Sequence, residues 1–226
     1  MTVKTALVLG ASGLIGTALL QELLVCNRYE TVIALVRQKL PLINDRLLQF
    51  QVDFNHIPAL EPLMRAEHVY CALGTTRKTA GSNENFYTID FTLIFELAQL
   101  ARKQGVQHFL LVSSIGANPD SKNIYLKTKG ELEQEILKLG FPALSIFRPS
   151  LLLGPRKEFR SVESLAKTIG YIVSPLLVGP LKPYRPIKAQ QVATAMLQSA
   201  KKHRKGNRLY MNEEIRQLSQ TQKGSP

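Results

Sequence analysis

Three polar residues in the middle of the chain have types and a spacing that suit proton transfer. Tyr125 lies four positions before Lys129, so in a helix the phenol and the ammonium share one face. A cation close to a phenol favours the phenolate and lowers the pKa of the tyrosine towards neutrality. Ser114, eleven residues before Tyr125, follows an apolar run and offers a hydroxyl that could hold a substrate oxygen. The alternative is a tyrosine and a lysine that are merely neighbours on a helix surface.

The chain contains its own control for this spacing. Tyr184 and Lys188 are also four residues apart, but Pro183 and Pro186 prevent one regular helical face there. The upstream serine, the strand that precedes it and the proline-free helical segment distinguish the pair at Tyr125.

A glycine-rich turn near the start of the chain suits the binding of a dinucleotide. Glycines recur at every third position from Gly10 to Gly16, where the apolar run Val3–Leu9 is followed by the helical segment Leu14–Val25. The first glycine permits a tight turn, the second lets backbone approach a pyrophosphate, and the third lets helix pack on strand. The first N–H groups of the helix would then face the phosphates. The residues assigned to this site are Gly10, Ser12, Gly13, Leu14, Ile15 and Gly16. The alternative is a turn with a structural role alone.

Strand-like and helix-like segments alternate along the first two thirds of the chain. The expected strands are Val3–Leu9, Thr31–Val36, Leu48–Val52, His68–Leu73, His108–Val112 and Ala143–Phe147. The expected helices are Leu14–Val25, Asn85–Lys103 and Ile124–Leu139. This alternation predicts the α/β class, with a doubly wound parallel sheet covered by helices on both faces. Ligands of such sheets bind at the carboxyl ends of the strands.

The residues after the second, third and fourth strands are the next candidates. Arg37 stands where an acid would hold the ribose hydroxyls of NAD, and a guanidinium there accommodates a 2′-phosphate. Arg37 therefore favours NADP(H) over NAD(H), unless it is only a surface arginine. Asp53 and Phe54 could contact the adenine, or Asp53 could simply begin a loop. After the fourth strand, a glycine and two hydroxyls could lie against the cofactor; the residues assigned there are Leu73, Gly74, Thr75 and Thr76.

Bulk properties fit one soluble domain of 226 residues, with 45% hydrophobic and 20% charged side chains. Residues 1–150 form the expected dinucleotide-binding core and residues 151–226 a small substrate-binding extension. In the extension we expect helices over Val162–Val173 and Ala189–Lys201, a strand over Arg208–Met211 and a frayed tail over Gln217–Pro226. The sequence shows no export signal and no run of membrane-spanning length, so we expect a cytoplasmic protein. Two cysteines and four scattered histidines show no metal-ligand spacing, and no metal is expected.

The net charge of +12 is the unusual bulk property. A nucleic acid or an acidic membrane would suit it, but the basic run Lys201–Lys205 ends an expected helix, where cations complement the helix dipole. No aromatic residues interleave with the basic ones. We therefore expect a small-molecule substrate, and neither a nucleic acid nor a membrane as partner. The two long helices over 85–103 and 124–139 offer a face for a homodimer.

Together the motifs resemble the short-chain dehydrogenase/reductase superfamily, in its extended or atypical branch. The match rests on the glycine turn, on Ser114 and on the pair Tyr125-x-x-x-Lys129. Phe147-Arg148-Pro149-Ser150 is similar to that branch's loop beside the nicotinamide. The segments 71–77 and 184–187 resemble the Tat-interacting-protein-like group, including its bacterial relatives.

The resemblance implies a Rossmann fold and a role for each residue of the site. Ser114 would orient the substrate, and Tyr125 would be the general acid and base. Lys129 would hold the nicotinamide ribose, and Pro149 and Ser150 would lie beside the cofactor.

One departure from the family pattern concerns the helix before these residues. Asp90 stands where many members have an asparagine that completes a proton relay. This affects the expected catalytic efficiency, because an ionised acid cannot donate a hydrogen bond as an amide does.

Two classes of function follow. The first is an NADP(H)-dependent oxidoreductase that transfers a hydride between nicotinamide and a small carbonyl or alcohol, with Tyr125 as acid and base. Epimerase or dehydratase chemistry uses the same groups, but the short region after residue 150 leaves less room for a nucleotide sugar. The second is an NADPH-binding sensor with little or no turnover. The intact set of Ser114, Tyr125 and Lys129 favours the enzyme, because a sensor has no need of a proton donor.

Overall fold

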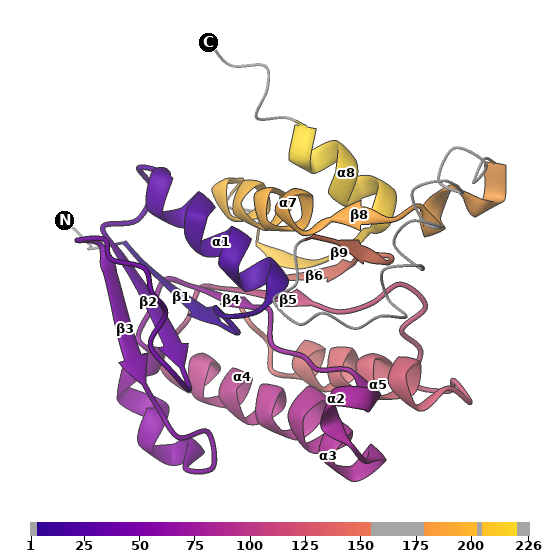
Figure 1. The fold of residues 1–226 in the computed structure, drawn as a ribbon, viewed down its shortest axis with the longest axis horizontal. Coiled ribbons are helices and arrows are strands. Elements are labelled where there is room, and N and C mark those ends of the chain that lie inside the picture. The colour runs from indigo at the N-terminus through magenta and orange to yellow at the C-terminus, as the bar shows by residue number, and fades with distance from the viewer. Residues whose placement is uncertain (1–3, 155–178, 203–204, 221–226) are drawn as a thin grey trace.

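The structure, a computed structural model, describes residues 4–154, 179–202 and 205–220. Its centre is a seven-stranded sheet in the order β3-β2-β1-β4-β5-β6-β9 (Figure 1). Every neighbouring pair of strands in this sheet is parallel. The strands are β1 (Thr5–Leu9), β2 (Thr31–Val36), β3 (Leu47–Gln51), β4 (His68–Cys71), β5 (His108–Val112), β6 (Ala143–Arg148) and β9 (Gly206–Met211). The expected doubly wound parallel sheet is confirmed.

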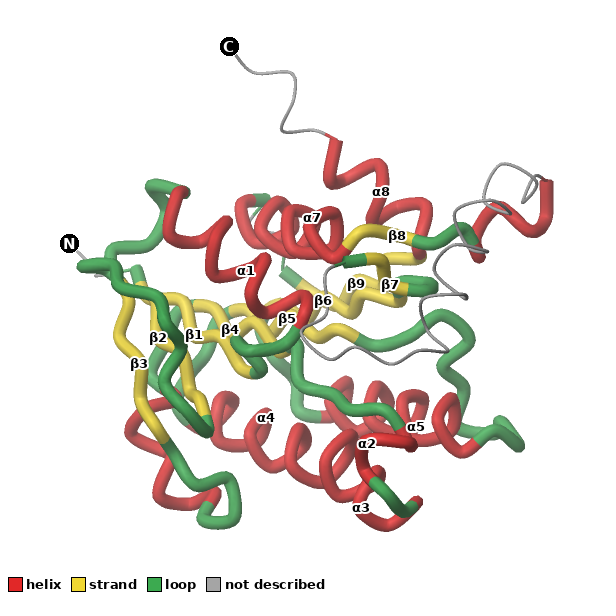
Figure 2. The backbone as a smooth tube through the Cα atoms, in the orientation of Figure 1, coloured by secondary structure: helices red, strands yellow, loops and turns green. Residues whose placement is uncertain are grey.

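Helices cover both faces of this sheet (Figure 2). On one face lie α1 (Leu14–Val25), α7 (Ala189–Lys201) and α8 (Asn212–Gln220), whose apolar side chains join one buried cluster. On the other lie the 3₁₀ segment η1 (Ile57–Met64) with α4 (Leu93–Lys103) and α5 (Ile124–Lys138), which form a second cluster. Every residue of β4 and β5 is buried, as expected for a parallel sheet covered twice.

The strand order reverses between β1 and β4, which makes this the switch point of the sheet. Leu9, the last residue of β1, is in register with Leu35 of β2 and with Cys71 of β4. The carboxyl ends of these strands therefore lie side by side, and the turns that follow them meet.

The expected helix over Asn85–Lys103 is real but is not uniform. It begins at α3 (Asn83–Tyr87), where Ser82 caps it by accepting a hydrogen bond from the Asn85 backbone. It then passes through a π-helical turn, η2 (Thr88–Thr92), before α4. A short helix, α2 (Arg77–Ala80), precedes it. The π turn adds a residue between the two regular segments, and such turns are common at functional sites.

The expectation of a frayed tail is wrong for residues 217–220, because α8 continues to Gln220. Asn212, Ile215 and Leu218 recur at every third residue and are all buried, so one face of this polar helix packs on the domain. The strand β9 is the seventh strand of the main sheet, paired with β6. The helix expected over Val162–Val173 lies outside the described residues.

A second, two-stranded sheet joins β7 (Leu152–Leu153) to β8 (Ile187–Lys188) in parallel. The 3₁₀ segment η4 (Gly179–Tyr184) precedes β8, so Tyr184 and Lys188 share no helical face, as the prolines predict. None of the described helices is both long and apolar enough to cross a membrane.

Candidate functional site

The turn after β1 requires glycine at two of its positions. Gly10 has a φ of +83°, and a Cβ there would lie 2.7 Å from the carbonyl carbon of Ala72, just after β4. A Cβ on Gly16 would lie 2.0 Å from the carbonyl oxygen of Gly10. The backbone of the turn therefore packs closely on the end of β4, and the backbone of α1 packs closely on the turn.

The amino end of α1 is open to solvent. Ser12 and Gly13 are exposed, no side chain caps the helix, and its first turn contains no acidic residue. Unpaired N–H groups at a helix start, with the positive end of the helix dipole, suit a phosphate. A Cβ on Gly13 would lie 3.3 Å from the carbonyl oxygen of Gly10, at an exposed position. The turn therefore fits the pyrophosphate of a dinucleotide.

Loops from four adjacent strands meet around this turn. Gly74 follows β4, Ser114 follows β5 and Pro149 follows β6, and these strands are neighbours of β1 in that order. The Ile115 N–H donates to the carbonyl of Pro149 across 2.9 Å. Gly154 lies against Leu14, since a Cβ on this glycine would lie 2.5 Å from the leucine Cδ1. The fold thus brings the assigned residues after β1, β4, β5 and β6 to one edge.

The lysine of the Tyr/Lys pair lies in a buried ion pair. The Lys129 ammonium nitrogen is 2.7 Å from Oδ1 of Asp90, and the two side chains are 5% and 1% exposed. The other carboxylate oxygen of Asp90 accepts the backbone N–H of Thr75 at 2.7 Å. The residue that departs from the family pattern therefore contacts the lysine directly.

Tyr125 stands one turn before Lys129 on α5. Asn123 caps this helix, accepting the backbone N–H of Tyr125 at 2.9 Å. The Tyr125 ring is half-buried and its centroid lies 5.7 Å from that of Phe86. Burial alone would lower the pKa of Lys129, but the charges of Asp90 and of the Tyr125 phenol outweigh it, and the net pKa is raised. The ammonium thus stays charged within electrostatic reach of the phenol.

Two serines, not one, stand at the end of β5. Ser114 is half-buried, and its hydroxyl donates to the carbonyl of Ile115 at 3.3 Å. Ser113 is buried, and its hydroxyl has no hydrogen-bond partner among the described residues. The Ser113 N–H continues the ladder to Phe147 at 2.7 Å, so strand alternation places this side chain on the face of Leu111, which α4 and α5 cover. Sequence reasoning passed over Ser113, although it directly follows the strand.

The residues expected around the adenosine lie farther along the sheet. Arg37 is exposed at the end of β2, and Asp53 is exposed after β3. The Asp53 carboxylate accepts the Asn55 backbone N–H at 2.9 Å and lies 3.2 Å from the His56 ring. These bonds, the one from the Asn55 backbone first, hold the pKa of Asp53 below its usual value. This is the geometry of a carboxylate that begins a loop, and its contact with adenine stays a prediction.

Partners inside the protein also engage the two threonines after β4. The Thr75 N–H is held by Asp90, and the Thr76 hydroxyl caps α2 by accepting the Thr79 N–H at 3.1 Å. Gly74 is exposed between β4 and these residues. The loop is thus ordered by its own hydrogen bonds.

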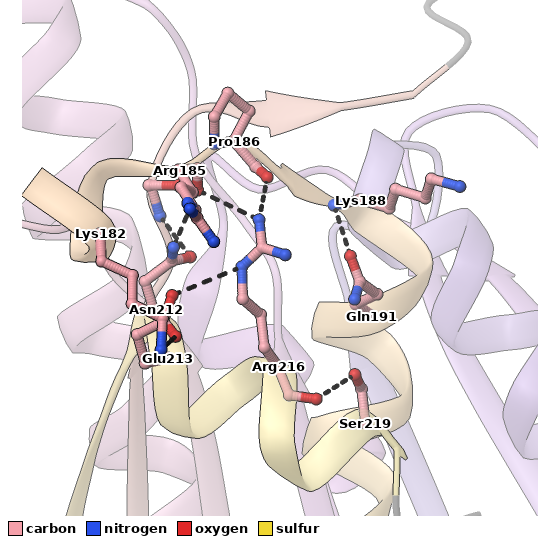
Figure 3. A network of polar contacts seen from close by, with 10 residues as sticks. Lys182, Arg185, Pro186, Lys188, Gln191, Asn212, Glu213, Arg216 and Ser219 are labelled. Carbon is pink, nitrogen blue, oxygen red and sulfur yellow. Dashed lines mark hydrogen bonds and ion pairs between the residues drawn. The ribbon is translucent and has the colours of Figure 1, made fainter. Parts of the chain in front are cut away.

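The loop after β6 is braced by the start of α8, in a network that the sequence did not indicate (Figure 3). The Asn212 Oδ1 accepts the Ser150 N–H at 3.1 Å, and its Nδ2 donates to the carbonyl of Arg185 at 2.9 Å. The Ser150 hydroxyl donates to the same carbonyl, and the Arg216 guanidinium donates to the carbonyl of Pro186. Asn212 follows the strand β9 directly, so a search at every strand end would have found it.

A second set of contacts holds Arg148, the last residue of β6, at the start of this loop. The Arg148 guanidinium donates from Nε to Oε1 of Glu133 at 2.9 Å and to Oε2 at 3.2 Å. Glu133 is buried on α5, one turn beyond Lys129. The last residue of β6 is thereby tied to the helix that carries the Tyr/Lys pair.

A family model and several relatives match most of this chain. A model of the NAD dependent epimerase/dehydratase family matches residues 6–210. The Protein HTATIP2 of Rattus norvegicus is 39% identical over 168 residues, which are 73% of this chain and 69% of that protein. The Protein FMP52, mitochondrial, of Candida albicans is 35% identical over 202 residues, which are 86% and 87% of the two chains.

Solved structures share the fold at low sequence identity. The UDP-glucose 4-epimerase of Thermotoga maritima, with UDP-glucose, has a TM-score of 0.66 at 16% identity, covering 96% of this chain and 82% of that chain. The Bordetella bronchiseptica enzyme WbmH, in complex with NAD⁺, has a TM-score of 0.70 at 15% identity, covering 92% and 75%. At these identities the likeness establishes the Rossmann-like α/β fold.

Proposed function

Because the chain belongs to the NAD dependent epimerase/dehydratase family, we propose that it is an NADP(H)-dependent oxidoreductase acting on a small carbonyl or alcohol. One observation carries this proposal. The Lys129 side chain, one helical turn after Tyr125 on α5, is buried and pairs with Asp90, which also accepts the backbone N–H of Thr75 in the loop that follows β4 at the switch point. A proton donor and a fixed cation therefore lie beside the edge where such sheets bind nucleotides.

The nicotinamide cofactor, when bound, supplies or accepts the hydride. The chain's own residues have three tasks. The turn at Gly10 to Gly16 holds the pyrophosphate with the first N–H groups of α1. Lys129 holds the ribose and keeps a positive charge near Tyr125. Tyr125 gives its hydroxyl proton to the substrate oxygen in reduction and takes it back in oxidation, while the Ser114 hydroxyl orients that oxygen.

Arg37 supports the preference for NADP(H) over NAD(H). Its guanidinium is exposed at the end of β2, beside the strand that carries the glycine turn. An exposed guanidinium there can bind a 2′-phosphate through two parallel hydrogen bonds. The NAD named with WbmH belongs to that protein.

We further propose that the partner of this protein is a small-molecule substrate, and neither a nucleic acid nor a membrane. We also propose that the enzyme is cytoplasmic. The fungal relatives are named mitochondrial, so the location stays a prediction.

Two variants test the proposal with purified protein. Binding of NADPH and NADH is measured by titration, and turnover is measured by cofactor absorbance with a panel of aldehydes and ketones. We expect Tyr125→Phe to bind NADPH as the wild type does but to lose about 10²-fold or more in kcat. Tyr87→Phe, at an exposed residue that ends α3, is the matched control and should turn over normally. NADPH binding without turnover on any carbonyl would support the sensor instead.

The cofactor preference is tested separately. Arg37→Glu should weaken NADPH binding by about tenfold or more, because it removes a charged hydrogen-bond donor and adds a like charge to the phosphate. NADH binding should be unchanged or better. An unchanged ratio of the two affinities would show that Arg37 does not select the cofactor.

A further inference from the structure

We propose that Asp90 is a positioning residue for Lys129, and that its two carboxylate oxygens tie the lysine ammonium to the backbone N–H of Thr75. This inference rests on the proposed function, since it concerns the lysine that assists Tyr125. Asp90 thereby joins the site, where it positions the lysine ammonium and balances its charge.

The polar contacts of Asp90 explain why an acid occupies this position. Its Oδ2 accepts a hydrogen bond from the Thr75 N–H at 2.7 Å, and its Oδ1 forms an ion pair with the Lys129 ammonium at 2.7 Å. A carboxylate offers two acceptor oxygens, whereas an asparagine offers one oxygen and an amide that can only donate. Asparagine would therefore oppose a donor to a donor at one of the two contacts. Aspartate in place of asparagine weakens a proton relay through this position, but it allows Asp90 to contact both Thr75 and Lys129.

Burial makes the ion pair strong, because neither charge can be solvated instead. Asp90 and Lys129 are both buried. Charges taken out of water are costly unless they are paired, and each of these two groups compensates the other. The ammonium has three N–H groups, which leaves it donors for the ribose hydroxyls and the phenol.

The loop after β4 rests directly on this ion pair. A Cβ on Gly74 would lie 3.2 Å from Oδ1 of Asp90 and 3.5 Å from Nζ of Lys129. The π turn that carries Asp90, the helix α5 and the loop at the switch point are therefore joined at one point. A change in any one of them moves the lysine.

The charges around the pair set the pH dependence. The titratable groups that act on the pair are Tyr125 on α5, which helps to raise the pKa of Lys129 against the effect of burial, and Cys71 at the end of β4. Burial raises the pKa of Cys71 to about 11, so this thiol is neutral at physiological pH. Asp90 is thus the anion that balances Lys129. Removing its charge lowers the pKa of Lys129, because the carboxylate is the main group that raises this pKa against the effect of burial.

The test compares Asp90→Asn with Asp45→Asn, which removes the same charge from an exposed site on a distant loop. Turnover and NADPH affinity are measured from acid to alkaline pH. We expect the limb of the pH–rate profile that reports proton loss to move to lower pH by about one unit in Asp90→Asn only. We also expect a higher dissociation constant for NADPH in this variant. A profile that matches the wild type would overturn the proposal.

Two further measurements do not depend on turnover. In thermal unfolding, the losses in Tm of Asp90→Asn and Lys129→Met should not add in the double variant, because both remove one interaction. In the wild type, nitrogen-edited NMR should show one slowly exchanging lysine ammonium signal that is lost in Lys129→Met. Additive losses would refute the ion pair where both variants fold. The absence of the ammonium signal would refute it even if Asp90→Asn failed to fold. A wild type without turnover would instead refute the proposed function, while these two measurements would still judge the ion pair.

Discussion

The side chain of Asn212 binds Ser150 and Arg185 together, using both ends of one amide. Its oxygen accepts the Ser150 N–H at 3.1 Å, and its nitrogen donates to the Arg185 carbonyl at 2.9 Å. The amide is fully buried at the start of α8. The loop after β6, which is expected beside the nicotinamide, is therefore held in place by the C-terminal helix.

Asn212→Ala should lower the free energy of unfolding by about 2 kcal/mol or more, because it leaves the buried Ser150 N–H without its acceptor and removes one of the donors to the Arg185 carbonyl. Urea unfolding followed by circular dichroism measures this loss. Asn207→Ala, on the exposed side of β9, is the control and should change stability by less than about 0.5 kcal/mol. Equal effects of the two substitutions would show that the brace does not stabilise the domain.

The glycine turn allows folding and cofactor binding to be separated. In Gly16→Ala the new methyl would meet the Gly10 carbonyl oxygen at 2.0 Å, which neither backbone can accommodate. In Gly13→Ala the corresponding distance is 3.3 Å and the site is exposed. We expect Gly16→Ala to be unstable or insoluble, and Gly13→Ala to keep the wild-type Tm but bind NADPH at least about tenfold more weakly. Normal NADPH affinity in Gly13→Ala would argue against a pyrophosphate at this turn.

Much of the architecture can be predicted from local sequence patterns. Apolar runs predict the six strands of the core to within two residues at each end. The central strands are apolar because they are buried on both faces, whereas β3, at the edge of the sheet, contains Gln49 and Gln51 and is partly exposed. The glycine spacing predicts the close contact of Gly16 with Gly10, since these residues belong to the same turn, whereas the contact of Gly10 with Ala72 depends on the pairing of β1 with β4. The Tyr125 and Lys129 spacing predicts a shared helix face, which α5 provides.

The parts that were missed depend on residues far apart in the chain. Asp90 and Lys129 are separated by 39 positions, and only the packing of η2 on α5 shows that they pair. The helix α8 is polar apart from a narrow face at Ile215 and Leu218, and its composition alone resembles a frayed tail. The unpartnered hydroxyl of Ser113 is visible only once its surroundings are known.

The two serines after β5 should respond differently to replacement by alanine. Ser114→Ala should lower kcat by about 10²-fold with little change in Tm, because its half-buried hydroxyl is assigned to the substrate oxygen. Ser113→Ala removes a buried hydroxyl without a partner in the described part of the chain, so it should leave stability unchanged or slightly higher. Steady-state kinetics and thermal unfolding on both variants check this. The reverse pattern in kcat would assign the orienting role to Ser113.

Alkaline pH should destabilise the protein through two buried tyrosines. Burial raises the pKa of Tyr29 to about 12, although its hydrogen bond to Tyr70 opposes the shift, and burial raises the pKa of Tyr70 well above its usual value. In the unfolded chain both phenols lose their protons near pH 10. The folded protein keeps protons that the unfolded chain releases, so this stabilisation is complete below about pH 10 and is lost as the pH rises towards 12.

For Tyr29 the shift of about two pKa units corresponds to roughly 3 kcal/mol over this range. Urea unfolding at a series of alkaline pH values measures the slope, and tyrosinate absorbance reports when the phenols ionise. Tyr29→Phe is the informative variant. It should be less stable at neutral pH, because it loses the hydrogen bonds to the His68 ring at 2.5 Å and to the Tyr70 hydroxyl at 2.7 Å. Its stability should nevertheless fall less steeply above pH 10. A slope equal to that of the wild type would show that Tyr29 is not kept protonated by the fold.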